Sequence, residues 1–131
     1  MSYDLFADEP RTLGSSVKLS MLDAEVLYFS HLFGPSEANS LFLQLRQNIE
    51  WRQEQIKLYG QVHDLPRLTA WYGDPAKTYS YSGISITSLE WIDALLAIKN
   101  RIESVSDYSF NSVLLNRYRN GSDGVSWHAD D

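Results

Sequence analysis

The segment 110–119 has the strongest β-strand character in the chain, and it constrains the fold more than any other feature. A strand directs successive side chains to opposite faces of its sheet. Three side chains, Leu114, Asn116 and Tyr118, therefore share one face, and the opposite face carries those of Val113, Leu115 and Arg117. The segment is therefore expected to be a strand of a sheet.

Two helices accompany the strands. Ser36 is expected to cap the first helix, whose apolar residues recur every three or four positions. They are Ala38, Leu41, Phe42, Leu45 and Ile49. The second helix is expected over residues 88–105, opened by a capping box from Thr87 to Glu90. Its apolar stripe consists of Trp91, Leu95, Ile98, Ile102 and Val105. Helices beside several strands predict the α+β class.

Shorter strands are expected before and after these helices. Residues 17–33 predict two strands, the second over 25–33, and residues 51–58 and 61–65 predict a hairpin turning at Tyr59-Gly60. Further strands are expected over 67–72, 78–83 and 125–130, the last two separated in the chain by the second helix and by a loop at 120–124. Alternation in the 78–83 strand places Tyr79 and Tyr81 on one face.

Composition narrows the class of protein. The chain has 131 residues, 44% of them apolar, which suits one domain with a core; residues 1–16 are expected to be a loose leader to a domain over 17–131. No stretch approaches the ~20 apolar residues of a membrane span, so no membrane partner is expected. The absence of cysteine excludes disulfides and thiolate metal sites. The N-terminus lacks the pattern of a secretion signal, and a cytoplasmic location is expected.

The acidic charge is unevenly distributed. The net charge is −6, yet residues 44–119 carry nine basic and eight acidic side chains, while residues 120–131 carry three acids and no base. A bound cation could neutralise this C-terminal cluster. A polyanionic partner is therefore compatible with the sequence.

The acidic cluster contains a candidate metal-binding pair. On a strand, His128 and Asp130 face the same way about 7 Å apart, which suits two ligands of a two-histidine, one-carboxylate Fe(II) site. Exposed strand polars are the alternative. A calcium loop starting at Asn120 fails, because its sixth position, which needs glycine, is Val125. On the preceding strand, Asn116 and Tyr118 could bind a small carboxylate ligand through hydrogen bonds.

Several motifs in order resemble the AlkB-type dioxygenases, which use Fe(II) and 2-oxoglutarate to remove alkyl groups from nucleobases. The resemblance covers the chain from about Val26 to its last residue. Its motifs are Pro66-Arg67, Tyr72-Gly73, Tyr79-x-Tyr81-Ser82-Gly83, Phe110-Asn111, Asn116-x-Tyr118, Gly121-x-Asp123 and Trp127-His128-x-Asp130-Asp131.

The resemblance implies a role for each matching residue. His128 and Asp130 would ligate Fe(II), and Asn116 and Tyr118 would hold the cosubstrate 2-oxoglutarate. Tyr81 would stack on a flipped base. Three residues, Tyr79, Arg67 and Asp131, are implied to shape the pocket or contact the nucleic-acid strand. Tyr59 lies in a segment that resembles a hairpin that wedges into the base stack. Each residue also has a structural interpretation. Tyr79 and Tyr81 could pack in the sheet, and Asn116 and Tyr118 could form a pair in the core. Arg67 could form a surface ion pair, and Tyr59 could be a plain hairpin tip. His31 and His63 lie outside the motifs.

The implied reaction is oxidative demethylation of N1-methyladenine or N3-methylcytosine in DNA or RNA, using O₂ and releasing formaldehyde. The implied fold is a double-stranded β-helix (jelly roll) supported by two N-terminal helices. No histidine follows His128, and the arginines that would pair with 2-oxoglutarate are absent. We therefore expect an incomplete jelly roll, truncated after the His128–Asp130 strand, that binds Fe(II) poorly and does not demethylate by itself.

Two other classes of function fit the same residues. A non-catalytic nucleic-acid binding module would keep the aromatic pocket without iron, and a jelly-roll interaction domain would bind no ligand. A dioxygenase acting on protein or small molecules is a third alternative, although the two tyrosines and Pro66-Arg67 favour a base. The oligomeric state is left open.

Overall fold

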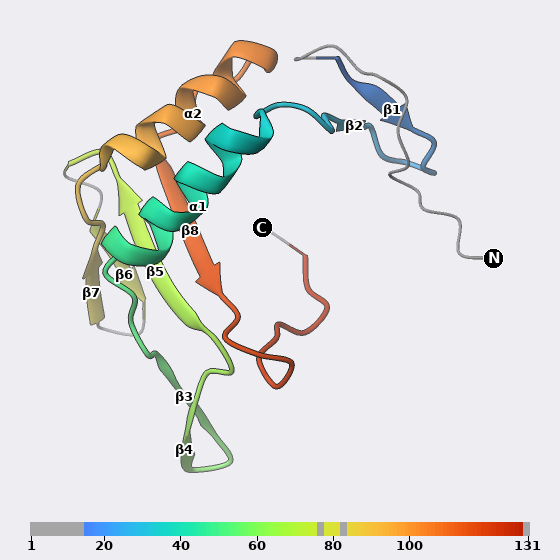
Figure 1. Ribbon diagram of the computed structural model, residues 1–131. Helices are drawn as coiled ribbons and strands as arrows, with labels where there is room; N and C mark the ends of the chain where they lie inside the picture. The colour runs from blue at the N-terminus through green and yellow to red at the C-terminus, as the bar shows by residue number, and fades with distance from the viewer. Residues whose placement is uncertain (1–14, 76–77, 82–83, 130–131) are drawn as a thin grey trace.

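Two antiparallel strands, β5 (Leu68–Gly73) and β8 (Ser112–Arg117), form the sheet on which both helices pack (Figure 1). The computed structural model describes residues 15–75, 78–81 and 84–129. In the register of the sheet, Ala70 lies opposite Leu115 and Tyr72 opposite Val113. These pairs place one continuous apolar face against the helices, because opposed residues share a face.

The remaining elements are arranged around this sheet. Helix α1 (Pro35–Asn48) and helix α2 (Asp93–Val105) contact each other. Three further two-stranded antiparallel sheets are formed by β1 (Val17–Leu19) with β2 (Val26–Tyr28), β3 (Gln55–Leu58) with β4 (Gln61–Asp64), and β6 (Thr78–Tyr81) with β7 (Ile84–Thr87). In Figure 1 the β3–β4 hairpin projects beyond the start of β5. The predicted α+β class and both predicted helices are confirmed.

The core lies between the central sheet and the helices. Its buried members are Ile49, Ala70, Tyr72 and Leu95, surrounded by partly buried side chains from β8, both helices and the segments that flank them. Tyr72 is 2% exposed, and its hydroxyl accepts a hydrogen bond of 3.0 Å from the backbone N–H of Glu50. Burial of a large side chain such as that of Ile49 or Leu95 stabilises the fold by roughly 1.5–3 kcal/mol.

Both helices begin differently from the prediction. Gly34 is the N-cap of α1, and Ser36 lies inside the first turn without a capping hydrogen bond, because Pro35 occupies the first helical position that its fixed φ suits. Helix α2 begins at Asp93, not near Ser88. Leu89 instead forms a parallel bridge with Tyr72. This tertiary contact holds the segment extended, so the predicted capping box is wrong.

The predicted alternation of β8 is confirmed. Leu114 is 66% exposed, and Asn116 and Tyr118 are also exposed, whereas Val113, Leu115 and Arg117 are partly buried on the helix side. We call the face of β5 and β8 beneath the helices the covered face, and the face that carries Thr69, Trp71, Leu114 and Asn116 the open face.

The predicted strand over 125–130 is wrong for residues 125–129, which are irregular. Alternating polarity alone does not make a strand, because a strand also needs a hydrogen-bonding partner, and none of the described strands pairs with this segment. Four separate two-stranded sheets do not by themselves establish a jelly roll. Among the described residues, no helix has the length and hydropathy to cross a bilayer.

Candidate active site

Asn116 and Tyr118 follow the open face of the sheet. Asn116 lies opposite Thr69, and Leu114 lies opposite Trp71. Thr69 is 4% exposed, and its Oγ1 atom is buried without a hydrogen-bond partner. The amide and the phenol are thus exposed on this side of the sheet, while the Thr69 hydroxyl is buried. Such polar groups can orient a small carboxylate ligand.

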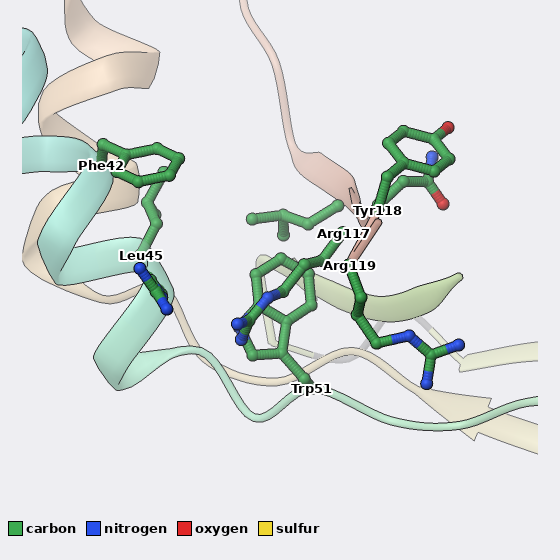
Figure 2. Close-up of a pocket in the computed structure, with 9 residues that line it drawn as sticks. Phe42, Leu45, Trp51, Arg117, Tyr118 and Arg119 are labelled. Atoms are coloured by element: carbon green, nitrogen blue, oxygen red, sulfur yellow. The ribbon is translucent and has the colours of Figure 1, made fainter. Parts of the chain in front are cut away.

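A hollow of about 630 Å³ surrounds the end of β8 beside α1. In Figure 2, Arg117 points toward Trp51 while Tyr118 points away from it, as expected for neighbours on a strand. The guanidinium carbon of Arg117 lies 5.9 Å from the centroid of the Trp51 ring. The lining contains three arginines and no acidic side chain: Phe42, Leu45, Arg46, Trp51, Leu115, Asn116, Arg117, Tyr118 and Arg119. Three arginines thus line this hollow, and one of them, Arg119, is paired with Asp123.

The loop after β8 is fixed by an ion pair between Arg119 and Asp123. The Nε atom of Arg119 lies 2.8 Å from Oδ2 of Asp123, and the backbone N–H of Arg119 donates to the same oxygen at 2.9 Å. Arg119 Nη1 also donates to Oε1 of Gln53 at 3.2 Å. The side-chain hydrogen bond from Arg119 lowers the pKa of Asp123 below its ordinary value and raises that of Arg119.

A second pair of contacts fastens the end of the same loop. The backbone N–H of Gly124 donates to the carbonyl of Pro66 at 2.8 Å, and Nη1 of Arg67 donates to the carbonyl of Gly124 at 3.3 Å. The predicted substrate-contacting residue Arg67 is thus placed beside the segment that leads to His128. Its Nε atom is buried without a partner.

His128 is exposed, and its Nδ1 lies 2.8 Å from the backbone carbonyl of Ser126. Because a carbonyl only accepts, Nδ1 carries the proton, and this is the tautomer in which Nε2 can bind a metal. Asp130 and Asp131 lie outside the described residues. Within residues 15–75, 78–81 and 84–129, no three His, Cys, Asp or Glu side chains converge as a metal site. In the described part of the chain His128 thus has a tautomer that suits a metal ligand, and its predicted pairing with Asp130 stays a prediction.

The predicted substrate residues lie on two other sheets. Tyr59 is at the tip of the β3–β4 hairpin with its side chain fully exposed, and its φ is 50° while that of Gly60 is 77°. Tyr79 and Tyr81 lie in β6, opposite Ile86 and Ile84 of β7. Their strand is confirmed, but their side chains lie outside what the structure describes. The shared face of the two rings stays a prediction.

Sequence reasoning missed the contacts of Gln53, Arg119 and Asp123. Asp123 was part of the motif Gly121-x-Asp123, but it had no assigned role. The available signal was the spacing of Arg119 and Asp123, four residues apart across the turn at Asn120-Gly121. Gln53 carried no such signal, because its contact spans 66 residues of sequence.

The chain is similar in sequence to known oxygenases. Residues 25–131 match the 2OG-Fe(II) oxygenase superfamily. The chain is 36% identical over 106 residues to the mouse DNA oxidative demethylase ALKBH2, an alignment that covers 79% of this chain and 44% of the relative. It is 35% identical over 106 residues to the human ALKBH2, covering 79% of this chain and 41% of the relative.

A second group of relatives is matched over a shorter stretch. The chain is 44% identical over 96 residues to the bovine alpha-ketoglutarate-dependent dioxygenase alkB homolog 3, covering 72% of this chain and 33% of the relative. The chain thus spans less than half the length of these relatives. The predicted resemblance to AlkB-type proteins is confirmed, and the matching family implies Fe(II) as cofactor and 2-oxoglutarate as cosubstrate.

Proposed function

Because the chain belongs to the 2OG-Fe(II) oxygenase superfamily, we propose that the whole protein is a dioxygenase that oxidatively demethylates alkylated DNA. The observation that carries this proposal is the family match over residues 25–131, which includes every predicted site residue. The relatives named DNA oxidative demethylase support DNA as the substrate.

His128 and Asp130 would hold the Fe(II) ion, and Asn116 and Tyr118 would hold 2-oxoglutarate. Bound Fe(II) with 2-oxoglutarate and O₂ supplies the oxidising chemistry. The residues of this chain have a positioning role. The carbonyl of Ser126 keeps the proton of His128 on Nδ1. The amide of Asn116 on β8 and the phenol of Tyr118 just after it would orient the cosubstrate on the exposed side of the sheet.

The substrate would be a flipped base such as N1-methyladenine or N3-methylcytosine, in DNA or RNA. Tyr81 would stack on the base, with Tyr79 and Asp131 beside it, since aromatic stacking is how extruded bases are commonly held. The exposed ring of Tyr59 at the tip of a projecting hairpin suits insertion beside the extruded base. The position of Arg67 next to Gly124 supports a role at the wall of the pocket.

The test is removal of the methyl group from N1-methyladenine in an oligonucleotide by the whole protein supplied with Fe(II), 2-oxoglutarate and O₂. We expect formaldehyde release that His128→Ala abolishes and that His31→Ala, a histidine outside the motifs, leaves unchanged. Turnover that survives His128→Ala would refute the metal assignment. Oligonucleotide binding without turnover under all conditions would favour the non-catalytic binding module.

A further inference from the structure

The segment that carries His128 has no strand pairing to hold it. Residues 118–129 leave the end of β8 and run without regular secondary structure. Figure 1 shows this segment turning back beside the sheet after β8. A metal ligand must nevertheless be held in a defined position to contribute to a site. The contacts that fix this segment must therefore come from side chains and from isolated backbone hydrogen bonds.

The strongest of these contacts is the ion pair at the start of the segment. One carboxylate, that of Asp123, accepts from the backbone N–H, Nε and Nη2 of Arg119 at 2.9, 2.8 and 3.2 Å. The side chain of Asp123 is only 7% exposed, whereas that of Arg119 is 41% exposed. Charge-assisted bonds from a planar guanidinium to both oxygens fix orientation as well as distance. The ion pair between Arg119 and Asp123 therefore holds the turn between these two residues in one conformation.

The turn is also joined to the body of the molecule. Gln53, which precedes β3, accepts from Nη1 of Arg119, and its own Nε2 donates to the carbonyl of Leu65 at 2.9 Å. At the other end of the turn, Gly124 bonds to the carbonyl of Pro66. Both attachments reach the residues that enter β5. The turn is thus fixed to the segment that leads into β5, and not only to itself.

From this arrangement we propose that Arg119 and Asp123 are positioning residues that set the location of His128 relative to Asn116 and Tyr118. The proposal rests on the function proposed above. Neither residue needs to touch the metal or the cosubstrate. Their pair closes the turn, the turn presents Gly124 to Pro66 and Arg67, and the following residues carry the imidazole.

The experiment compares graded variants of the pair in the whole protein. Asp123→Ala removes every acceptor, Asp123→Asn keeps one oxygen without the charge, and Arg119→Lys keeps the charge without the planar fork. The matched control is Glu25→Gln, which breaks the exposed Lys18–Glu25 pair of 3.0 Å on the remote β1–β2 hairpin. Two readouts are used: hydrogen exchange of the Gly124 amide, and the affinity for Mn(II) as a redox-stable probe of the site.

We expect Asp123→Ala to accelerate exchange at Gly124 and to weaken Mn(II) binding about tenfold, the lower end of the effect known for residues that orient metal ligands. Asp123→Asn and Arg119→Lys should fall between this variant and the parent, and Glu25→Gln should match the parent. The intermediate variants keep the test informative if Asp123→Ala fails to fold.

Two results would overturn the proposal while leaving the proposed function intact. One is parental exchange at Gly124 in all three variants, and the other is faster exchange with parental Mn(II) affinity. A parent protein whose Mn(II) binding is absent, or is unaffected by His128→Ala, would instead overturn the proposed function and this inference with it.

Discussion

The two faces of the β5–β8 sheet have different surroundings although they share the same backbone, most clearly along β8, since Thr69 on the open face of β5 is only 4% exposed. On the covered face, Ala70 and Tyr72 are at most 3% exposed beneath the helices. On the open face, Leu114 is 66% exposed and Asn116 is also exposed. The covered face holds the fold together, whereas the open face presents polar groups that the fold does not use. The candidate cosubstrate residues occur only where packing does not require them.

The sharpest test of this difference deletes the same side chain on each side of the sheet. Leu95→Ala should lower the free energy of unfolding by about 3 kcal/mol, because it leaves a cavity against the covered face. Leu114→Ala should change it by less than about 0.5 kcal/mol, because the side chain already meets solvent. Urea denaturation of both variants measures the two values. Equal losses would show that the two faces are not distinct.

The open face should affect ligand binding without affecting stability. Asn116→Ala in the whole protein should weaken 2-oxoglutarate binding about tenfold, or about 1.4 kcal/mol, through loss of an orienting amide. Titration calorimetry gives the affinity, and a parallel urea curve should match the parent. Asn111→Ala, an exposed amide just before β8, is the control. A stability loss in place of the affinity loss would assign Asn116 to the core.

A smaller change in stability is expected when the hydroxyl of Tyr72 is removed from the covered face. Tyr72→Phe should destabilise the protein by about 1 kcal/mol, because the N–H of Glu50 loses its acceptor while the ring stays buried. Tyr108→Phe, at a ring that is 73% exposed, should be neutral. Thermal unfolding followed by circular dichroism compares the pair. No difference between them would mean that solvent replaces the lost bond.

The smallest expected effect is the loss of stability at acidic pH from two carboxylates, Glu103 and Asp123. The N–H of Phe110 and the side chain of Lys99 lower the pKa of Glu103 below its ordinary value of 4.5, and Arg119 lowers that of Asp123 below 3.8. A lowered folded-state pKa gives stability that is present above the ordinary value and is lost as pH falls through the lowered one. These two groups should therefore not change the melting temperature with pH above about pH 5. As the pH is lowered below about 4.5, they should cause the melting temperature to decrease.

Variants at the two carboxylates separate their contributions. Glu103→Gln and Asp123→Asn should each make the acid decline of the melting temperature shallower than in the parent, while Glu25→Gln should not. An unchanged decline in both variants would mean that other carboxylates dominate acid unfolding.

The parts of the fold that depend on local pattern were predictable. The alternation of β8 came directly from sequence, because period-two spacing is set by the backbone, whereas the stripe of α1 is correct for the buried Leu41 and Ile49 but not for the exposed Ala38 and Phe42. The start of α2 was missed because the bridge between Leu89 and Tyr72 overrides a local capping signal. The 125–130 strand was predicted wrongly because alternation cannot supply a partner strand.

The residues of the candidate site stay predictions, and the contacts that support them were not predictable from the sequence. Asn116 and Tyr118 lie on one face as expected, and His128 has a tautomer that suits a ligand. The contact of Arg119 with Gln53 joins residues far apart in sequence, which no local pattern reveals. The partnership of His128 with Asp130 and the roles of Tyr79 and Tyr81 stay predictions.

The backbone of the turn at the tip of the β3–β4 hairpin determines which substitutions of Tyr59 selection should favour. Both of its central residues have positive φ, a geometry for which Asn-Gly is the favoured sequence. Tyrosine at the first position is conformationally unfavourable, and its fully exposed ring recovers nothing by packing. A library of variants selected only for thermal stability should therefore replace Tyr59 readily with asparagine, whereas a library selected for the proposed demethylation of nucleic acid should retain an aromatic ring there.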